Sequence, residues 1–203
     1  MSPHYASAKA ELLSNPAVTA VSSGGGNVVA RWSATLDVDW EGKAPDLTFF
    51  VHDMTIDHDF IPLFKMKMVE GRNFVDGKSD SAHFILNETA VKQMGLKDPI
   101  GKRFRWHRTE GQVIGVVKDF HYTPLNNVIQ PFVFAYSESS EILYVKADSR
   151  NMPEAVTAVE KIWNNYNSGS HLFLHSWTTP IRNIILPTHA RVIYSGCSQG
   201  SQS

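Results

Sequence analysis

The sequence predicts an α+β (mixed α/β) fold, because short strand-like segments alternate with helix-like segments and tight turns along its 203 residues. Its 42% hydrophobic and 11% aromatic residues are enough for a packed core and argue against disorder. This length allows one sizeable core or two small lobes, and the chain contains no internal repeat.

The first third of the chain predicts one helix, several strands and a short helical turn. Residues 6–13 suit a helix that ends before Asn15-Pro16, because a residue preceding proline avoids helical geometry. Asp57 is expected to cap a short helix over residues 60–63. The remaining segments are expected as strands at 18–21, 34–40, 47–51 and 66–69, with residues 22–27 forming a loop.

The rest of the chain contains clearer helix signals. Asn87 is an N-cap candidate for a helix through Met94, and Gly95 would end that helix. We expect the substitution Asn87→Ala to remove about 1 kcal/mol of stability through the lost cap. Pro153 opens a second helix with Val156, Val159 and Trp163 on one face. Strands are expected at 84–86, 102–106, 112–117, 132–136, 142–146 and 172–174.

Charge and cysteine content exclude several classes of protein. With a formal net charge of −1, the chain lacks the positive electrostatic field that is typical of nucleic-acid-binding proteins. No apolar run approaches the roughly 20 residues of a membrane helix, and the first residues lack the pattern of a signal peptide. The single cysteine, Cys197, excludes an intrachain disulfide and a cysteine-based zinc site.

His52-Asp53 and Asp57-His58-Asp59 concentrate side chains of the kind that bind zinc, manganese or iron. Neighbouring residues in a strand point to opposite faces, however, and no H-E-x-x-H motif follows. A metal-dependent enzyme built on His52, Asp57 and His58 is therefore an alternative hypothesis. The main expectation is that the chain binds no metal and no cofactor and has no catalytic residue.

Two other segments carry weaker chemical signals. Residues 118–121 (KDFH) place an acid and a base at a strand end, but no nucleophile motif accompanies them, and Asp119 equally suits a loop that binds its own backbone. The glycines at 24–26 lack the following Lys-Ser/Thr pair of a phosphate-binding loop, and Ser22 and Ser23 lack a hydrolase motif. We therefore expect no ATP hydrolysis by this chain.

Aromatic side chains offer two further interpretations. Residues 102–108 (KRFRWHR) alternate basic and aromatic side chains as single-strand nucleic-acid binders do, but the neutral net charge favours a solvated strand face. A small-molecule or lipid-binding module would use Trp32, Trp40, Phe49 and Phe50 as a pocket wall, whereas aromatic residues of this kind more commonly fill a core.

Five fragments in order carry a family resemblance. They are residues 70–74 (EGRNF), 86–90 (LNETA), 95–102 (GLKDPIGK), 113–121 (VIGVVKDFH) and 129–131 (IQP). Together they resemble the MacB-like periplasmic core domain of FtsX-type ABC transporter permeases, in the style of Bacteroidetes members. The residues suit structural roles in turns, caps and core. The positions that carry the resemblance are Gly71, Arg72, Asn87, Glu88, Gly95, Asp98, Pro99, Gly101, Gly115, Asp119 and Pro131.

The resemblance implies a porter-like lobe with a smaller inserted lobe. Residues 1–75 and 128–176 are expected to form the porter-like lobe, and residues 76–127 the inserted one. The resemblance also implies a non-catalytic extracytoplasmic domain that transmits ATP-driven movement. Its expected partners are a cytoplasmic ABC ATPase, a second permease copy and a periplasmic protein or lipoprotein, with no nucleic acid. The expected location is the periplasmic face of the inner membrane.

Both ends depart from the family pattern. No membrane helix precedes Met1, so we expect a soluble piece of a longer permease. Family members continue after the last strand with a Leu-Asp-Asp/Glu segment, whereas this chain reads Trp177-Thr178 after Ser176. A shifted reading frame through these codons restores Leu-Asp. Residues 177–203 are therefore expected to be a non-family tail, and the nucleotide sequence of the gene tests this.

Overall fold

The computed structural model describes residues 4–25, 33–75, 78–120, 128–138, 142–166, 173–177 and 190–196. Strands and helices alternate along these residues, which confirms the mixed α/β class. The helices are α1 (Tyr5–Leu13), α2 (Phe60–Leu63), α3 (Glu88–Met94) and α4 (Met152–Tyr166), with short 3-10 helices η1 (Lys78–Asp80) and η2 (Ser149–Asn151). The strands are β1 (Val18–Gly24), β2 (Ser33–Thr35), β3 (Val38–Trp40), β4 (Val51–Ile56), β5 (Met68–Gly71), β6 (His83–Asn87), β7 (Arg103–Trp106), β8 (Thr109–Val117), β9 (Phe132–Tyr136), β10 (Ile142–Asp148), β11 (Phe173–Trp177) and β12 (Ala190–Gly196).

The twelve strands of the described residues belong to one mixed sheet in the order β11-β12-β10-β1-β4-β9-β6-β8-β7-β3. Beside this path, β2 pairs with β4 and β5 pairs with β8. β4 runs parallel to β9 and β6 runs parallel to β8, whereas the other described pairs are antiparallel. Strands β7 and β8 form a hairpin, and the sheet continues from this hairpin to β3 at one edge.

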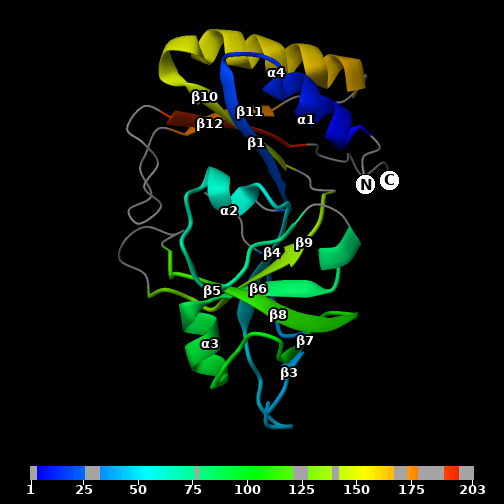
Figure 1. The fold of residues 1–203 in the computed structure, drawn as a ribbon, viewed down its shortest axis with the longest axis vertical. Coiled ribbons are helices and arrows are strands. Elements are labelled where there is room, and N and C mark those ends of the chain that lie inside the picture. The colour runs from blue at the N-terminus through cyan, green and yellow to red at the C-terminus, as the bar shows by residue number, and fades with distance from the viewer. Residues whose placement is uncertain are drawn as a thin grey trace, which may run out of the picture.

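The sheet has two halves that meet at a narrow junction. The first half contains β1, β10, β11 and β12, and helices α1 and α4 lie over it at the top of Figure 1. The second half contains β2 to β9 with α2 and α3. β1 and β4 join the halves through one register pair, Gly24 with Ile56. Two backbone hydrogen bonds flank that pair, from Gly25 to Thr55 and from Asp57 to Ser23.

Three groups of buried side chains follow this division. The first-half core joins α1, β1, β10 and α4 and includes Leu12, Val21 and Val159. The second-half core joins β3, β4, β6, β7, β8, β9 and α3 and includes Trp40 and Phe84. A third group, which we call the junction core, brings α2, β4, β6, β8 and β9 together with β10. The junction core therefore contains side chains from both halves of the sheet.

Helix α4 forms where the sequence predicts a helix, but its buried face differs from the expected one. Pro153 lies in its first turn, where a missing N–H is tolerated. Its buried residues Met152, Ala155, Val159 and Ile162 recur at helical spacing. Val156 packs against the first-half core but is only partly buried, whereas Ala155 is fully buried, so the buried face is rotated from the one expected.

Three expectations for the first third of the chain were wrong in their bounds. The predicted loop 22–27 begins too early, because β1 continues through Ser22 and Ser23 to Gly24. The predicted strand 34–40 is divided into β2 and β3. The predicted strand 47–51 is displaced, because the strand that pairs with β9 is β4, residues 51–56. The expectation followed the strand-forming residues at 47–51. The strand forms instead over the next segment, β4, because that segment pairs with β9.

The expected lobe boundaries stay a prediction. β3 and β5 lie within residues 1–75, yet they pair with β7 and β8 from residues 76–127. β12 lies within residues 177–203 and pairs with both β10 and β11. Strand pairing thus joins residues of the two expected lobes, and it joins part of the expected tail to the sheet. The reading-frame hypothesis likewise stays a prediction.

Candidate functional site

Asn87 lies at the end of β6, where three separate segments of the chain meet. Its side-chain oxygen accepts from the amides of Ala90 (2.9 Å) and Phe132 (2.8 Å), which caps α3 and also holds the start of β9. Its amide nitrogen donates to Asp119 Oδ1 (2.9 Å) and to the carbonyl of Gln130 (3.0 Å). The predicted cap is confirmed. Asn87 is fully buried, so these four bonds satisfy a polar group that water cannot reach.

Asp119 follows β8 and completes the same cluster. Its carboxylate accepts from the amide of Thr89 (2.9 Å) and from the Thr89 hydroxyl (2.7 Å). Its own amide donates to Glu88 Oε2 (2.9 Å). The acid of the predicted KDFH segment is therefore bound to the first turn of α3. Phe120 is buried in the junction core, and His121 lies outside the described residues.

Gly71 and Gly115 face each other where β5 pairs with β8. A Cβ at Gly115 would lie 2.4 Å from the Arg72 carbonyl oxygen, and one at Gly71 would lie 2.2 Å from the Ile114 carbonyl oxygen. Real side chains do not approach backbone so closely. These two glycines thus allow two strands to pack at a distance that any side chain would prevent.

Arg72 reaches across to Asp80 in η1. Its guanidinium donates two hydrogen bonds to the Asp80 carboxylate, at 3.1 and 2.8 Å. The amide of Val75 donates to the same carboxylate, and the His83 Nδ1 atom lies 2.7 Å from it. Burial of Asp80 opposes its ionisation, but these partners outweigh burial and lower its pKa to about 2.

The remaining family positions shape turns. Gly95 ends α3 in the left-handed conformation with φ 66°. Asp98 and Gly101 also have positive φ, and the carbonyl of Pro99 accepts from the Lys102 amide. The carbonyl of Pro131 accepts from the His52 amide and so extends the pairing of β4 with β9.

Asp57 is fully buried at the junction, and it is not the N-cap of α2. Residue Asp59 occupies the N-cap position and makes no side-chain cap bond. Asp57 instead accepts from Tyr5 and Lys9 of α1, from Ser22 of β1 and from the Asp59 amide. Sequence reasoning did not identify Tyr5 or Lys9, because contacts across 48 or 52 residues leave no local pattern.

The proposed metal ligands do not come together. His52 lies near the start of β4, beside the carbonyl of Ser33 and the ring of Phe132, whereas Asp57 follows the end of the strand. His58 lies 3.3 Å from Asp59. Within the described residues, no group of three or more His, Cys, Asp or Glu side chains is placed to hold a metal ion.

Three of the four Lys and Arg residues of segment 102–108 are paired with acids from elsewhere in the chain. Lys102 contacts Glu41, Arg103 contacts Asp39 and Arg105 contacts Asp37, at 2.6 to 2.7 Å. Trp106 donates to Asp53 (2.9 Å). The positive charges of β7 are therefore offset by β3 and its flanking residues rather than gathered for a phosphate backbone.

The expected aromatic pocket wall is mostly core. Trp40 and Phe49 are buried in edge-to-face contact in the second-half core, and the Trp40 indole donates to the Met94 carbonyl. Phe50 is exposed and packs on His52. Trp32 lies outside the described residues. A groove of about 310 Å³ instead borders α1, where Tyr5, Lys9, Leu13 and His58 form part of its lining.

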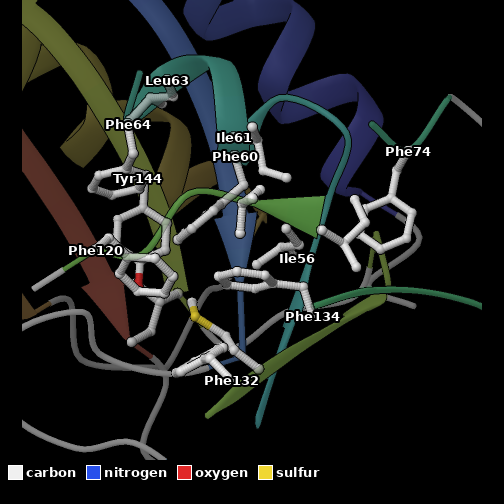
Figure 2. Close-up of a cluster of buried hydrophobic side chains, with 14 of the residues drawn as sticks. Ile56, Phe60, Ile61, Leu63, Phe64, Phe74, Phe120, Phe132, Phe134 and Tyr144 are labelled. Carbon is white, nitrogen blue, oxygen red and sulfur yellow. The ribbon is translucent and has the colours of Figure 1, made fainter. Parts of the chain in front are cut away.

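The junction core is an aromatic cluster that crosses between the halves of the sheet. Figure 2 shows Phe60 of α2 and Phe64, which follows this helix, beside Tyr144 of β10, with Phe134 of β9 nearby. The Tyr144 ring centroid lies 5.4 Å from that of Phe60 and 5.3 Å from that of Phe64. Phe60 in turn lies 6.1 Å from Phe134, so ring contacts continue from one half to the other.

The fold is that of a mixed α/β domain. Its clusters of polar side chains form hydrogen bonds that connect segments of the same chain. Comparison with known families gives the particular class. The chain belongs to the family of MacB-like periplasmic core domains, whose model matches residues 2–162. This confirms the expectation that the five fragments carried. No curated protein matches the chain. Among the helices of the described residues, none is long and apolar enough to span a membrane.

Two solved structures share this fold. The periplasmic region of MacB from Actinobacillus actinomycetemcomitans matches with 14% identity and a TM-score of 0.50, over 98% of this chain and 66% of that one. The extracellular domain of the noncanonic ABC-type transporter YknZ from Gram-positive bacteria matches with 13% identity and a TM-score of 0.57, over 78% of this chain and 81% of that one. This chain thus spans just under two thirds of the MacB region.

Proposed function

We propose that this chain is the non-catalytic extracytoplasmic domain of an ABC transporter permease. In this role it passes on ATP-driven movement of flanking membrane helices, either to export or to a periplasmic partner. Family membership supports the assignment to a permease. We assign ATP hydrolysis to a cytoplasmic ATPase, since the sequence contains no Gly-x-x-x-x-Gly-Lys-Ser/Thr motif and the glycine before Gly77-Lys78-Ser79 is one residue too far away. The further partners are a second permease copy and a periplasmic protein or lipoprotein.

The observation that carries this proposal is the junction core. The sheet itself joins the two halves by one register pair, which alone is a weak connection. Buried side chains of α2, β4 and β9 pack across that point against Ile142 and Tyr144 of β10. Because packed interiors resist deformation, displacement of the first half moves the second half with it. A domain built in this way transmits force without performing chemistry.

The test compares two matched substitutions in the full-length permease. Phe60→Leu removes an aromatic ring from the junction core, and Phe84→Leu removes one from the second-half core. Both side chains are at most 1% exposed, so each change should lower stability by a similar amount, about 1–2 kcal/mol. Transport and ATP hydrolysis are measured together in reconstituted membranes, at a temperature where both variants are folded.

Force transmission through the junction predicts different results for the two variants. Phe60→Leu should lower transport per ATP hydrolysed, whereas Phe84→Leu should leave that ratio near the wild-type value. Equal ratios in the two variants would contradict the proposal, because stability loss alone affects both. A loss of transport that accompanies an equal loss of ATP hydrolysis would also count against a purely mechanical role.

A further inference from the structure

Asp57 receives hydrogen bonds from two elements of the first half and from its own turn. Its Oδ2 atom accepts from the Tyr5 hydroxyl (2.5 Å) and from Lys9 Nζ (2.9 Å), both on α1. Its Oδ1 atom accepts from the Ser22 hydroxyl of β1 (2.5 Å) and from the Asp59 amide (3.2 Å). Lys9 also lies 2.5 Å from Asp59 Oδ2. The residue that follows β4 is thus bound to the first half of the sheet by three side chains.

Charge and burial make these contacts costly to break. The Asp57 side chain is completely buried, and the Lys9 side chain is 13% exposed. Burial lowers the pKa of Lys9, but hydrogen bonds and charges from Asp59 and Asp57 outweigh it and the pKa is raised. Burial and the Asp57 charge raise the pKa of Tyr5. Both groups therefore stay protonated as donors at neutral pH, and removing them leaves a buried carboxylate without its counter-charge.

Helix α1 has few other means of holding its first turn. It has nine residues, a length that is marginal for an isolated helix. His4 makes no side-chain cap bond, and the first turn contains no acidic residue. Leu12, the buried residue that anchors α1 in the first-half core, lies at the opposite end of the helix. Besides Tyr5 and Lys9, this end of the helix has the partly buried Ala8 against the first-half core and a ring contact between His4 and Tyr166.

We propose that Tyr5, Lys9 and Asp57 form a clamp that fixes the first turn of α1 to the junction between the two halves. When the clamp is closed, α1, β1 and the turn before α2 move as one body. When it opens, α1 stays anchored through Leu12 but no longer restrains the turn after β4. The clamp makes α1 a second connection across the junction, beside the junction core. Its part in force transmission rests on the proposed function, whereas its closure does not.

Amide hydrogen exchange of the 203-residue chain tests the clamp directly. The variant Tyr5→Phe/Lys9→Met keeps the side-chain bulk and removes both donors to Asp57 Oδ2. We expect the amides of α1 and of Gly25 and Asp57 to exchange at least about tenfold faster, an opening free energy lower by about 1.4 kcal/mol. The slowest amides of β6 and β8 exchange by global unfolding, so they also accelerate in this variant and do not distinguish the clamp. Phe84→Leu, in the second-half core, supplies the contrast, because it should accelerate these β6 and β8 amides and leave those of α1 unchanged. Lys161→Met, an exposed lysine on α4, is the control and should change neither group.

Two results would overturn the clamp. One is unchanged exchange in α1 of the double variant, and the other is acceleration of the α1 amides by Phe84→Leu to the same extent, which would show that these amides report only the stability of the whole domain. If the double variant does not fold, Tyr5→Phe alone removes one hydroxyl and keeps the Lys9 ion pair. That single variant should still accelerate the α1 amides, and the same acceleration by Phe84→Leu would again overturn the proposal.

The same double variant separates the clamp from the proposed function. In the reconstituted permease, transport per ATP should fall while α1 exchange is accelerated. If α1 exchange is accelerated by the double variant but not by Phe84→Leu, and transport per ATP is unchanged in the double variant, the clamp stands and its part in force transmission is overturned. If Phe60→Leu also leaves that ratio unchanged, the proposed function itself fails, independently of the exchange result.

Discussion

The Asn87 side chain makes hydrogen bonds to residues far away in sequence as well as to its own helix. The local pattern, a cap residue before a helix, predicts a single bond to the amide three residues later. The structure adds bonds to Asp119, to Gln130 and to the Phe132 amide, which lie 32 to 45 residues further along the chain. The cap could be predicted from the sequence, but the meeting of β6, β8 and β9 at this side chain could not.

These added bonds change the expected effect of Asn87→Ala. Loss of the cap alone would lower stability by about 1 kcal/mol. Since the change also removes the partners of a buried amide and a partly buried carboxylate, we expect a loss of about 2–4 kcal/mol in denaturant unfolding. Ser14→Ala, which removes a hydroxyl that donates to the exposed Glu11 carbonyl, is the control. A loss of about 1 kcal/mol or less would show that the distant bonds contribute little.

Gly95 and Gly115 are both required, but for different physical reasons. Gly95 has φ 66° with open space where a side chain would begin, whereas Gly115 faces the Arg72 carbonyl. Asparagine adopts the left-handed conformation readily, so Gly95→Asn should lower stability by less than about 1 kcal/mol. Gly115→Asn should lower it by about 3 kcal/mol or more, since backbone must move. Equal unfolding midpoints for the two variants would contradict this distinction.

At the scale of elements, Asp80 connects η1 to β5 and β6 through a charge that depends on pH. Its folded-state pKa of about 2 lies below the unfolded value near 3.9. The unfolded chain therefore binds more protons in acid, and the stability that Asp80 contributes, about 2 kcal/mol, is present above about pH 5 and is lost as the pH falls towards 2. In urea unfolding, the wild type should therefore have a higher free energy of unfolding than Asp80→Asn at neutral pH. This difference should become smaller as the pH is lowered.

Asp46→Asn, at an exposed position, is the control for the Asp80 experiment and should show a small difference at every pH. A wild-type advantage over Asp80→Asn that stays constant from neutral to acid pH would mean that the Arg72 and His83 contacts do not depend on the charge. The amide of Val75 would then be the main partner of this side chain.

Element types could be predicted more reliably than element bounds. The sequence indicated the cap and the stop of α3 because both depend on side chains within a few residues. It misplaced β4 because LTFFV is the more strand-like local segment, whereas parallel pairing with β9 selects residues 51–56. The clamp could not be predicted, since Tyr5 and Lys9 show only the pattern of a surface helix until β1 and β4 bring Asp57 beneath them.

At the scale of the whole molecule, the narrow sheet junction and the broad junction core have opposite consequences. One register pair, Gly24 with Ile56, would let the halves open separately. The ring of Phe60, however, packs against those of Phe134 and Tyr144 across the junction. Unfolding of one half would therefore expose apolar surface of the other half. Burial of apolar area is the dominant favourable term in folding. We therefore expect the packing of the junction core to outweigh the weak sheet pairing, so that the two halves unfold together.

Hydrogen exchange tests this cooperativity with a double substitution, Phe60→Ala/Tyr144→Ala, that empties both sides of the junction core. In the wild-type chain, the slowest amides of β10 in the first half and of β6 in the second half should report the same opening free energy, because both exchange by global unfolding. The double variant should separate these values by at least about 1 kcal/mol, since each half retains its own core. Val159→Ala, within the first-half core, should lower both values together. If the wild-type values already differ, or if the double variant lowers both equally, the junction core does not unite the halves, and the sheet pairing and the α1 clamp would have to carry any movement between them.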